Sequence, residues 1–325
     1  MNKKMYYRVL YLLFLLSVSS PIYSDFIVSH KTAGLEYPEN TLDGFIASLN
    51  MDVQAIEIDI HVTLDKQLVL HHDPVLHDHN CFNGNDHQDV VIAQTRLAEL
   101  ISIECINEKL EKPQPYQLPS LEDIFSLYLE SDQTKQLLIE VKVLDKLIEH
   151  YPHYRDLDTD IMHYSDAEVA DLLYAKIREF GLKDNIMFNT FSQSLLLELK
   201  GRKAANENFQ FGLLYKGDYA PLRLRLFALL KFRRCFDFCW LPNYQEVAIW
   251  LTENEIDFFI PNYPQLSSFL FREAYQKHID TEPRAFQVIP WTLNKEIEWE
   301  EAQNYLFDGI ITDKPSDYLE SFSIE

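Results

Sequence analysis

The stretch Ser29–Pro74 contains the residues that decide the fold: it begins SHKTAGLEYPENT (Ser29–Thr41), passes through AIEIDIH (Ala55–His61) and closes with LVLHHDP (Leu68–Pro74). Side chains alternate between the two faces of a strand, so Glu57 and Asp59 of the middle segment should share one face. Two carboxylates held this close repel each other unless they are protonated or bridged by a cation. Because an all-oxygen pair favours a hard ion, the pattern predicts a site for Mg²⁺ or Ca²⁺.

Two histidines follow apolar segments that have the pattern of strands. His30 follows Phe26–Ser29, and His72 follows Gln67–His71. Both imidazoles are therefore expected at the C-terminal ends of strands, where α/β barrels carry their chemistry. One imidazole can accept a proton while the other donates one, and Lys31 can hold an anion. A metal, a cation and paired imidazoles together favour cleavage of a phosphate ester.

Each of these residues also has a structural interpretation. A single histidine or Glu-x-Asp pair is more often a solvated or capping group, and only the combination indicates a site. Glu39–Thr41 has the pattern of a helix start with Asn40 as the N-cap. Strand alternation predicts that His71 points away from the side that His72 uses. His61 lies at or past the expected strand end and receives no role.

The rest of the chain repeats a strand-then-helix pattern, which predicts a TIM (β/α)₈ barrel with an inserted segment after the second strand. Such a barrel takes roughly 250 residues, so a chain of 325 residues that is 47% hydrophobic is long enough for one. Helical patterns lie between most strands, for example at Ser165–Phe180, Ser192–Lys200 and Gln245–Glu253. The expected strands are Phe26–His30, Gln54–Ile60, Gln136–Val141, Asn185–Asn189, Phe209–Leu214, Ile256–Ile260, Phe286–Trp291 and Asp308–Thr312.

The inserted segment covers about residues 73–120 and contains a short helix near Leu97–Ile101. Cys81 and Cys105 bracket much of it, and a disulfide between them would hold it in place. Its histidines, His77, His79 and His87, have the composition of a solvated loop rather than of a transition-metal site. Cys235 and Cys239, further along the chain, could pair or remain free.

The N-terminus has the pattern of a secretory signal over residues 1–24, because cations precede an apolar run from Val9 to Val18 and small residues follow it. The run is short for a membrane-spanning helix. We therefore expect export, to the periplasm or the medium in a bacterium, with residues 25–325 as the catalytic domain. The formal net charge of −22 disfavours a nucleic-acid partner. The basic segment Asp218–Cys235 could contact a membrane surface, although a helix packed on the barrel is the more common case.

At these residues the chain resembles the glycerophosphodiester phosphodiesterase family, whose signature runs His-Arg-Gly, Pro-Glu-Asn-Thr, Glu-Leu-Asp and His-Asp. The resemblance covers nearly all of the chain after about residue 25. The corresponding segments here are His30-Lys31-Thr32, Pro38-Glu39-Asn40-Thr41, Glu57-Ile58-Asp59 and His72-Asp73. Further matches are Leu118–Glu122, Ile139–Lys142, Asn189–Ser192, Trp291–Asn294 and Gly309–Pro315.

The resemblance implies divalent-metal-dependent hydrolysis of glycerophosphodiesters to sn-glycerol 3-phosphate and an alcohol, through attack by either a glycerol hydroxyl or water. It implies Glu57, Asp59 and Glu140 as metal ligands and His30 and His72 as the acid–base pair. Lys31, Lys142 and Trp291 are then expected to contact the substrate, and Lys142 should share the face of Glu140.

The signature departs from the family at one place, where Lys31-Thr32 replaces Arg-Gly. Lysine offers a point charge instead of a two-pronged donor, and threonine adds a side chain where the family has none. Two alternatives stay open: a phospholipid headgroup phosphodiesterase on the same barrel, and a non-catalytic binding protein.

Overall fold

The computed structural model describes residues 26–77, 79–82, 89–142, 164–216, 244–263, 285–305 and 307–322. The predicted signal at residues 1–24, the basic segment Asp218–Cys235, Cys239 and His87 lie outside this part of the chain. Within it, no helix has the length and apolar character needed to cross a membrane.

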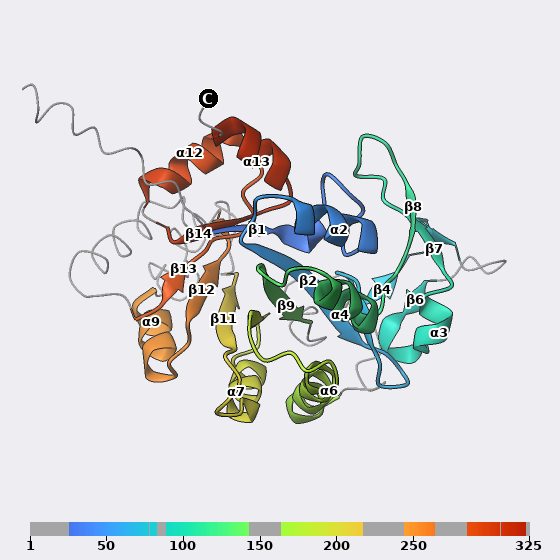
Figure 1. The fold of residues 1–325 in the computed structure, drawn as a ribbon, viewed down its shortest axis with the longest axis horizontal. Coiled ribbons are helices and arrows are strands. Elements are labelled where there is room, and N and C mark those ends of the chain that lie inside the picture. Colours follow the sequence, from blue (N-terminus) through green and yellow to red (C-terminus); the bar gives the residue numbers. More distant parts are fainter. Residues whose placement is uncertain are drawn as a thin grey trace, which may run out of the picture.

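Eight parallel strands form the barrel at the centre of the molecule (Figure 1). The sheet runs in the order β13-β12-β11-β10-β9-β2-β1-β14. Backbone hydrogen bonds from Asp308 N to Val288 O (3.0 Å) and from Ile311 N to Pro290 O (2.9 Å) join the two ends of this order and close the ring. The eight predicted strands are confirmed, with ends that differ from the predicted ones by at most three residues. Their bounds are β1 Phe26–Ser29, β2 Ala55–Val62, β9 Gln136–Val141, β10 Ile186–Thr190, β11 Gln210–Tyr215, β12 Phe258–Pro261, β13 Gln287–Val288 and β14 Gly309–Thr312.

Helices surround the barrel on its outside (Figure 1). Ser120 and Ser165 begin two of them with complete capping boxes, in which the N-cap side chain and the residue three positions later exchange hydrogen bonds. The three helices predicted between barrel strands are confirmed, as is the short one predicted near Leu97–Ile101 in the inserted segment. The described helices are α2 Leu42–Asn50, α4 Leu121–Glu130, α6 Asp166–Glu179, α7 Gln193–Arg202, α9 Tyr244–Glu253, α12 Glu296–Asn304 and α13 Pro315–Phe322.

The predicted N-cap of α2 is wrong. Thr41 is the cap, and its Oγ1 accepts a hydrogen bond from Gly44 N at 3.2 Å. Asn40 instead lies buried and bonds to Asp59 through both ends of its amide. Asn40 therefore bonds to a residue that is distant in the sequence, and not to the start of the helix as the local pattern predicted.

Strand alternation divides the barrel into an outer and an inner layer. Ile56, Ile58 and Ile60 of β2 are fully buried in the cluster that joins strands to helices. A smaller apolar cluster, including Leu138 and Met187, fills the interior. Glu57 and Asp59 face this interior because they alternate with the isoleucines, so their carboxylates are enclosed by the barrel.

The inserted segment follows β3 (Leu68–Leu70), which returns antiparallel along β2. Its elements are β4 Val75–Leu76, β5 Cys81–Phe82, β6 Val90–Val91, η2 Ile92–Gln94, α3 Leu97–Leu100, β7 Glu104–Ile106 and β8 Pro115–Gln117. The predicted disulfide joins Cys81 to Cys105 across β5 and β7, with an S–S distance of 2.04 Å. The segment has its own small apolar core and lies beside the barrel (Figure 1).

Candidate active site

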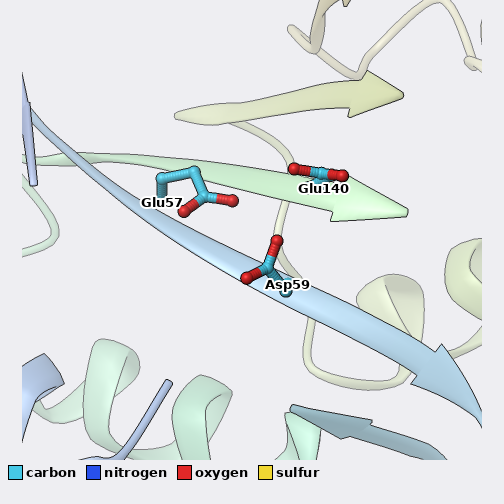
Figure 2. Close-up of side chains that lie close together, drawn as sticks. All are labelled: Glu57, Asp59 and Glu140. Carbon is cyan, nitrogen blue, oxygen red and sulfur yellow. The ribbon is translucent and has the colours of Figure 1, made fainter. Parts of the chain in front are cut away.

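Three acidic side chains converge inside the barrel near the C-terminal ends of its strands. Glu57 and Asp59 come from β2, and Glu140 comes from the neighbouring strand β9, directly opposite Asp59 (Figure 2). All three are buried, and one oxygen from each lies within 4.8 Å of the others. Among the described residues, this is the one group of side chains that could hold a metal ion.

The charges of this triad are only partly balanced by protein groups. Lys142 Nζ lies 2.8 Å from Asp59 Oδ1 and 2.5 Å from Glu140 Oε1, on the face that alternation predicted. Burial and the two neighbouring carboxylates hold the pKa of Glu57 well above its usual value. Burial raises the pKa of Glu140 to about 7, although Lys142 opposes this rise.

One oxygen of the triad has no partner in the part of the chain that the structure describes. Glu57 Oε1 is buried without a hydrogen bond. Three carboxylates share a single ammonium group, so a hard dication would balance the remaining charge and satisfy this oxygen. The residues present therefore fit a divalent metal ion with oxygen ligands.

His30 is held by a carboxylate that sequence reasoning did not assign. His30 Nδ1 lies 2.6 Å from Asp313 Oδ1, and Asn294 Nδ2 donates to the other oxygen of Asp313 at 2.7 Å. Burial opposes ionisation of Asp313, but the adjacent imidazole outweighs it and lowers the pKa of this carboxyl. An ionised carboxylate can only accept, so the proton lies on Nδ1 of His30 and leaves Nε2 free for chemistry. His30 Nε2 is 3.9 Å from Glu57 Oε2.

His72 reaches the same cavity by a route that differs from the prediction. It does not follow a barrel strand, because β3 runs antiparallel to β2 and brings the chain back toward the carboxylates. Its Nδ1 lies 2.8 Å from Asp73 Oδ1, and its carbonyl is 3.2 Å from His61 Nε2. Burial and the nearby ammonium groups lower the pKa of His72 to about 4, so the imidazole is neutral at pH 7. His71 is buried but is not among the described residues that line the cavity.

The loop after β1 presents both ends of Lys31 to the site. Its backbone N donates to Glu57 Oε2 at 2.7 Å, and its Nζ lies 3.6 Å from Glu39 Oε2. Lys31, Thr32 and Ala33 all have left-handed backbone angles, with φ of 50°, 59° and 63°. This conformation is costly for residues other than glycine, and most of all for a β-branched one. The departure at Thr32 thus keeps a glycine-like backbone, and its side chain is buried with Oγ1 accepting from Thr41 N.

A cavity of about 190 Å³ joins these groups. Its lining includes ionic side chains and an aromatic pair, in which Trp291 packs edge-on against Phe191 at 5.8 Å between ring centres. Asp59 is fully buried and is not among the described lining residues. The described lining residues are His30, Lys31, Glu57, His72, Glu140, Lys142, Asn189, Phe191, Leu214, Trp291, Thr292, Ile311 and Asp313.

Sequence reasoning missed the roles of three polar residues in or beside the cavity. Asp313 directly follows β14 and Asn189 lies near the end of β10, so their positions at C-terminal strand ends were the available signal. Asp73 was noted only as part of a motif. The sequence could not assign a role to any of the three, because it does not show which side chains they contact.

The sequence model of the glycerophosphoryl diester phosphodiesterase family matches residues 30–317. The chain belongs to this family. It is therefore a phosphoric diester hydrolase, which removes the non-catalytic alternative.

Relatives of this family resemble the chain over most of its length. The lysophospholipase D GDPD1 of Mus musculus is 24% identical over 91% of this chain and 86% of its own. The glycerophosphodiester phosphodiesterase of Caldanaerobacter subterraneus is 21% identical over 89% of this chain and 94% of its own.

Two solved structures share the fold. The phosphodiesterase of Oleispira antarctica, in complex with the product sn-glycerol-3-phosphate, has a TM-score of 0.64 and 16% identity, covering 92% of this chain and 97% of its own. The glycerophosphodiester phosphodiesterase of Thermotoga maritima has a TM-score of 0.60 and 16% identity, covering 91% and 97%. Both likenesses extend through the barrel and confirm its architecture.

Proposed function

We propose that this protein hydrolyses glycerophosphodiesters to sn-glycerol 3-phosphate and an alcohol, and that it requires a divalent metal ion. The observation that carries the proposal is the incompletely neutralised triad of Glu57, Asp59 and Glu140, which shares a cavity with two carboxylate-held histidines. Family membership supports the reaction class.

The triad would hold the metal ion, either Ca²⁺ or Mg²⁺, and a bound dication neutralises charge on phosphoryl oxygens. Lys31 and Lys142 add two ammonium groups to the same cavity. Nearby carboxylates keep the pKa of both lysines above the ordinary value despite burial, so both are charged at neutral pH. The phosphate of a diester would therefore meet positive charge from the protein as well as from the metal.

The two histidines would transfer the protons of the reaction. Each Nδ1 is engaged by a carboxylate, which orients the ring and directs Nε2 to chemistry. In the neutral form Nε2 can accept a proton from the attacking hydroxyl, and in the protonated form it can donate one to the leaving oxygen. Asp313 and Asp73 are positioning residues in this scheme because they act through the imidazoles.

The size and lining of the cavity favour binding of a small polar portion of the substrate, the glycerol phosphate. A volume of about 190 Å³ has room for a glycerol phosphate, and Trp291 and Phe191 offer an apolar wall to its carbon chain. The product named in the complex of Oleispira antarctica supports the same choice.

The names of the mammalian relatives favour a second candidate substrate. The three lysophospholipase D relatives, from mouse, rat and human, are 23% to 24% identical to this chain. A lysophospholipid carries the same glycerol phosphate, with an acyl chain on one glycerol oxygen. Both substrates would place the same phosphodiester at the triad.

One assay tests the proposal and separates the two substrates. Purified protein is incubated with glycerophosphocholine or with lysophosphatidylcholine, and release of choline and of sn-glycerol 3-phosphate is measured. We expect release from glycerophosphocholine, its loss in excess chelator, and its return on adding Mg²⁺ or Ca²⁺. Full activity in chelator would contradict the metal site, and cleavage of lysophosphatidylcholine alone would identify the second substrate.

We also propose that the protein acts outside the cytoplasm. The signal-like residues 1–24 and the disulfide between Cys81 and Cys105 both support an oxidising compartment. N-terminal sequencing of the native protein tests this: a start near residue 25 is expected, and a start at Met1 would contradict it.

A further inference from the structure

Asn189 lines the cavity with a buried amide oxygen that has no hydrogen-bond partner in the described structure. Asn189 is on β10, opposite Glu140 of β9, and its side chain therefore faces the interior as Glu140 does. Its exposed fraction is 1%, it lines the cavity, and its Oδ1 makes no hydrogen bond.

The surrounding strands explain why no described protein group satisfies this oxygen. On the other side of Asn189, β11 places Gly212, which has no side chain to donate. Gly212 could not readily be larger, because a Cβ there would lie 2.5 Å from Ile260 Cδ1. Burying an unpaired amide is costly, so a residue kept in this state points to a ligand that pairs with it.

The composition of the lining indicates what that ligand group is. It combines ionic side chains with the apolar side chains of Phe191, Leu214, Trp291 and Ile311. Among the described lining residues, the ones that are polar but do not titrate are Asn189 and Thr292. A neutral amide suits a neutral polar group, and it offers both an acceptor and two donors.

We propose that Asn189 binds a hydroxyl group of the substrate's glycerol and is a specificity-determining residue for the polyol half of the diester. The hydroxyl donates to Oδ1 and accepts from Nδ2, while the aromatic wall contacts the glycerol carbons. An alkyl phosphate without that hydroxyl leaves the buried amide unpaired, which disfavours it. This inference rests on the proposed function and adds the group that recognises glycerol.

Binding measurements with product analogues test the inference without relying on turnover. The ligands are sn-glycerol 3-phosphate, its two mono-deoxy analogues (2-hydroxypropyl phosphate and 3-hydroxypropyl phosphate) and propyl phosphate. Wild-type protein should bind sn-glycerol 3-phosphate roughly 5- to 100-fold more tightly than the analogue lacking the recognised hydroxyl. In Asn189→Leu that preference should fall to within about twofold, because the unpaired amide is gone while affinity for propyl phosphate remains.

Thr292→Val is the matched control, since it removes the other neutral polar group of the described lining and should keep the preference. If Asn189→Leu does not fold, Asn189→Ala replaces it with the same expectation. Retention of the full preference in the Asn189 variant, or its loss only in Thr292→Val, overturns the proposal. A wild type that hydrolyses glycerophosphocholine but shows no hydroxyl preference also overturns it and leaves the proposed function standing. A wild type without hydrolytic activity overturns the proposed function and the subsite together.

Discussion

The two ends of the barrel use acidic residues in opposite ways. At the N-terminal end, Asp257 and Asp308 precede their strands, and each accepts a hydrogen bond of 2.8 Å from a backbone N–H, of Phe211 and Val288 respectively. At the C-terminal end, Glu57 and Glu140 lie close together with raised pKa values, and Glu57 Oε1 has no described partner.

The direction of parallel strands explains the difference. The edge where the strands begin offers free N–H groups, which a carboxylate can accept from directly. The edge where they end offers carbonyl groups, so a carboxylate there needs a cation or a loop N–H such as that of Lys31. The same residue type therefore stabilises the barrel at one end and creates a cation-binding site at the other.

The sharpest test replaces one acidic residue at each end of the barrel, in separate variants. Glu57→Gln should reduce turnover to background and remove any rise in melting temperature on adding Mg²⁺ or Ca²⁺. It should also make the metal-free protein more stable at pH 8, because it removes a repelling charge. Asp308→Ala should do the reverse: it should keep turnover near that of wild type but cost about 1–3 kcal/mol in the free energy of unfolding, since Val288 N loses its acceptor. Assays and melting curves with and without chelator would show whether one variant loses turnover and the other loses stability. If both variants lost the same property, the proposed difference between the two ends would be wrong.

Histidine substitutions test whether the C-terminal end carries the proton transfers. His30→Ala and His72→Ala should each lower turnover by about 10²–10⁴-fold, the usual cost of removing a general acid or base. Metal-dependent thermal stabilisation should persist in both, since neither is expected to be a ligand. His71→Ala is the control and should change turnover far less. Near-normal rates in either of the first two variants would show that the acid–base assignment is wrong.

Substituting Lys31 tests the departure from the family signature. Lys31→Ala should raise KM by about tenfold, since it removes one charge-assisted contact to phosphate. Lys31→Arg should keep KM or lower it, because a two-pronged donor is restored. Both variants keep the backbone N–H that Glu57 accepts from. Equal KM values in all three proteins would mean that the ammonium group does not contact the substrate.

The smallest expected effect concerns acid sensitivity at the C-terminal end. Burial lowers the pKa of His61 to about 3, below its unfolded value near 6.5. The folded state therefore resists protonation, and the stability that this neutral histidine contributes is complete above about pH 6.5 and declines as the pH falls toward 3.

His61→Gln should accordingly lose less stability than wild type between pH 7 and pH 5, by on the order of 1–2 kcal/mol. Denaturant melts at the two pH values measure it. An unchanged pH dependence would show that folding does not lower the pKa of this histidine.

Much of the fold and part of the site could be predicted from the periodic pattern of the sequence. Alternation in AIEIDIH placed the three isoleucines on one face and the two acids on the other, because the side-chain period of a strand is local. The eight strand segments could be found for the same reason. Spacing also brought Lys142 to the face of Glu140, and the two bracketing cysteines indicated the disulfide.

Other features required contacts between distant parts of the chain. His30 meets Asp313 across 283 positions, a pairing that exists because β14 lies beside β1. Asn40 leaves the helix cap for Asp59, and His72 enters the cavity on a returning strand.

Asn189 shows the division between the two kinds of information. Its place near the end of a strand was readable from the sequence, but its lack of a described partner depends on Gly212 and Glu140 on the flanking strands. Local pattern determines which way a side chain points, because backbone geometry repeats along the chain. What that side chain meets is decided only when the barrel closes, because its neighbours come from strands far away in the sequence.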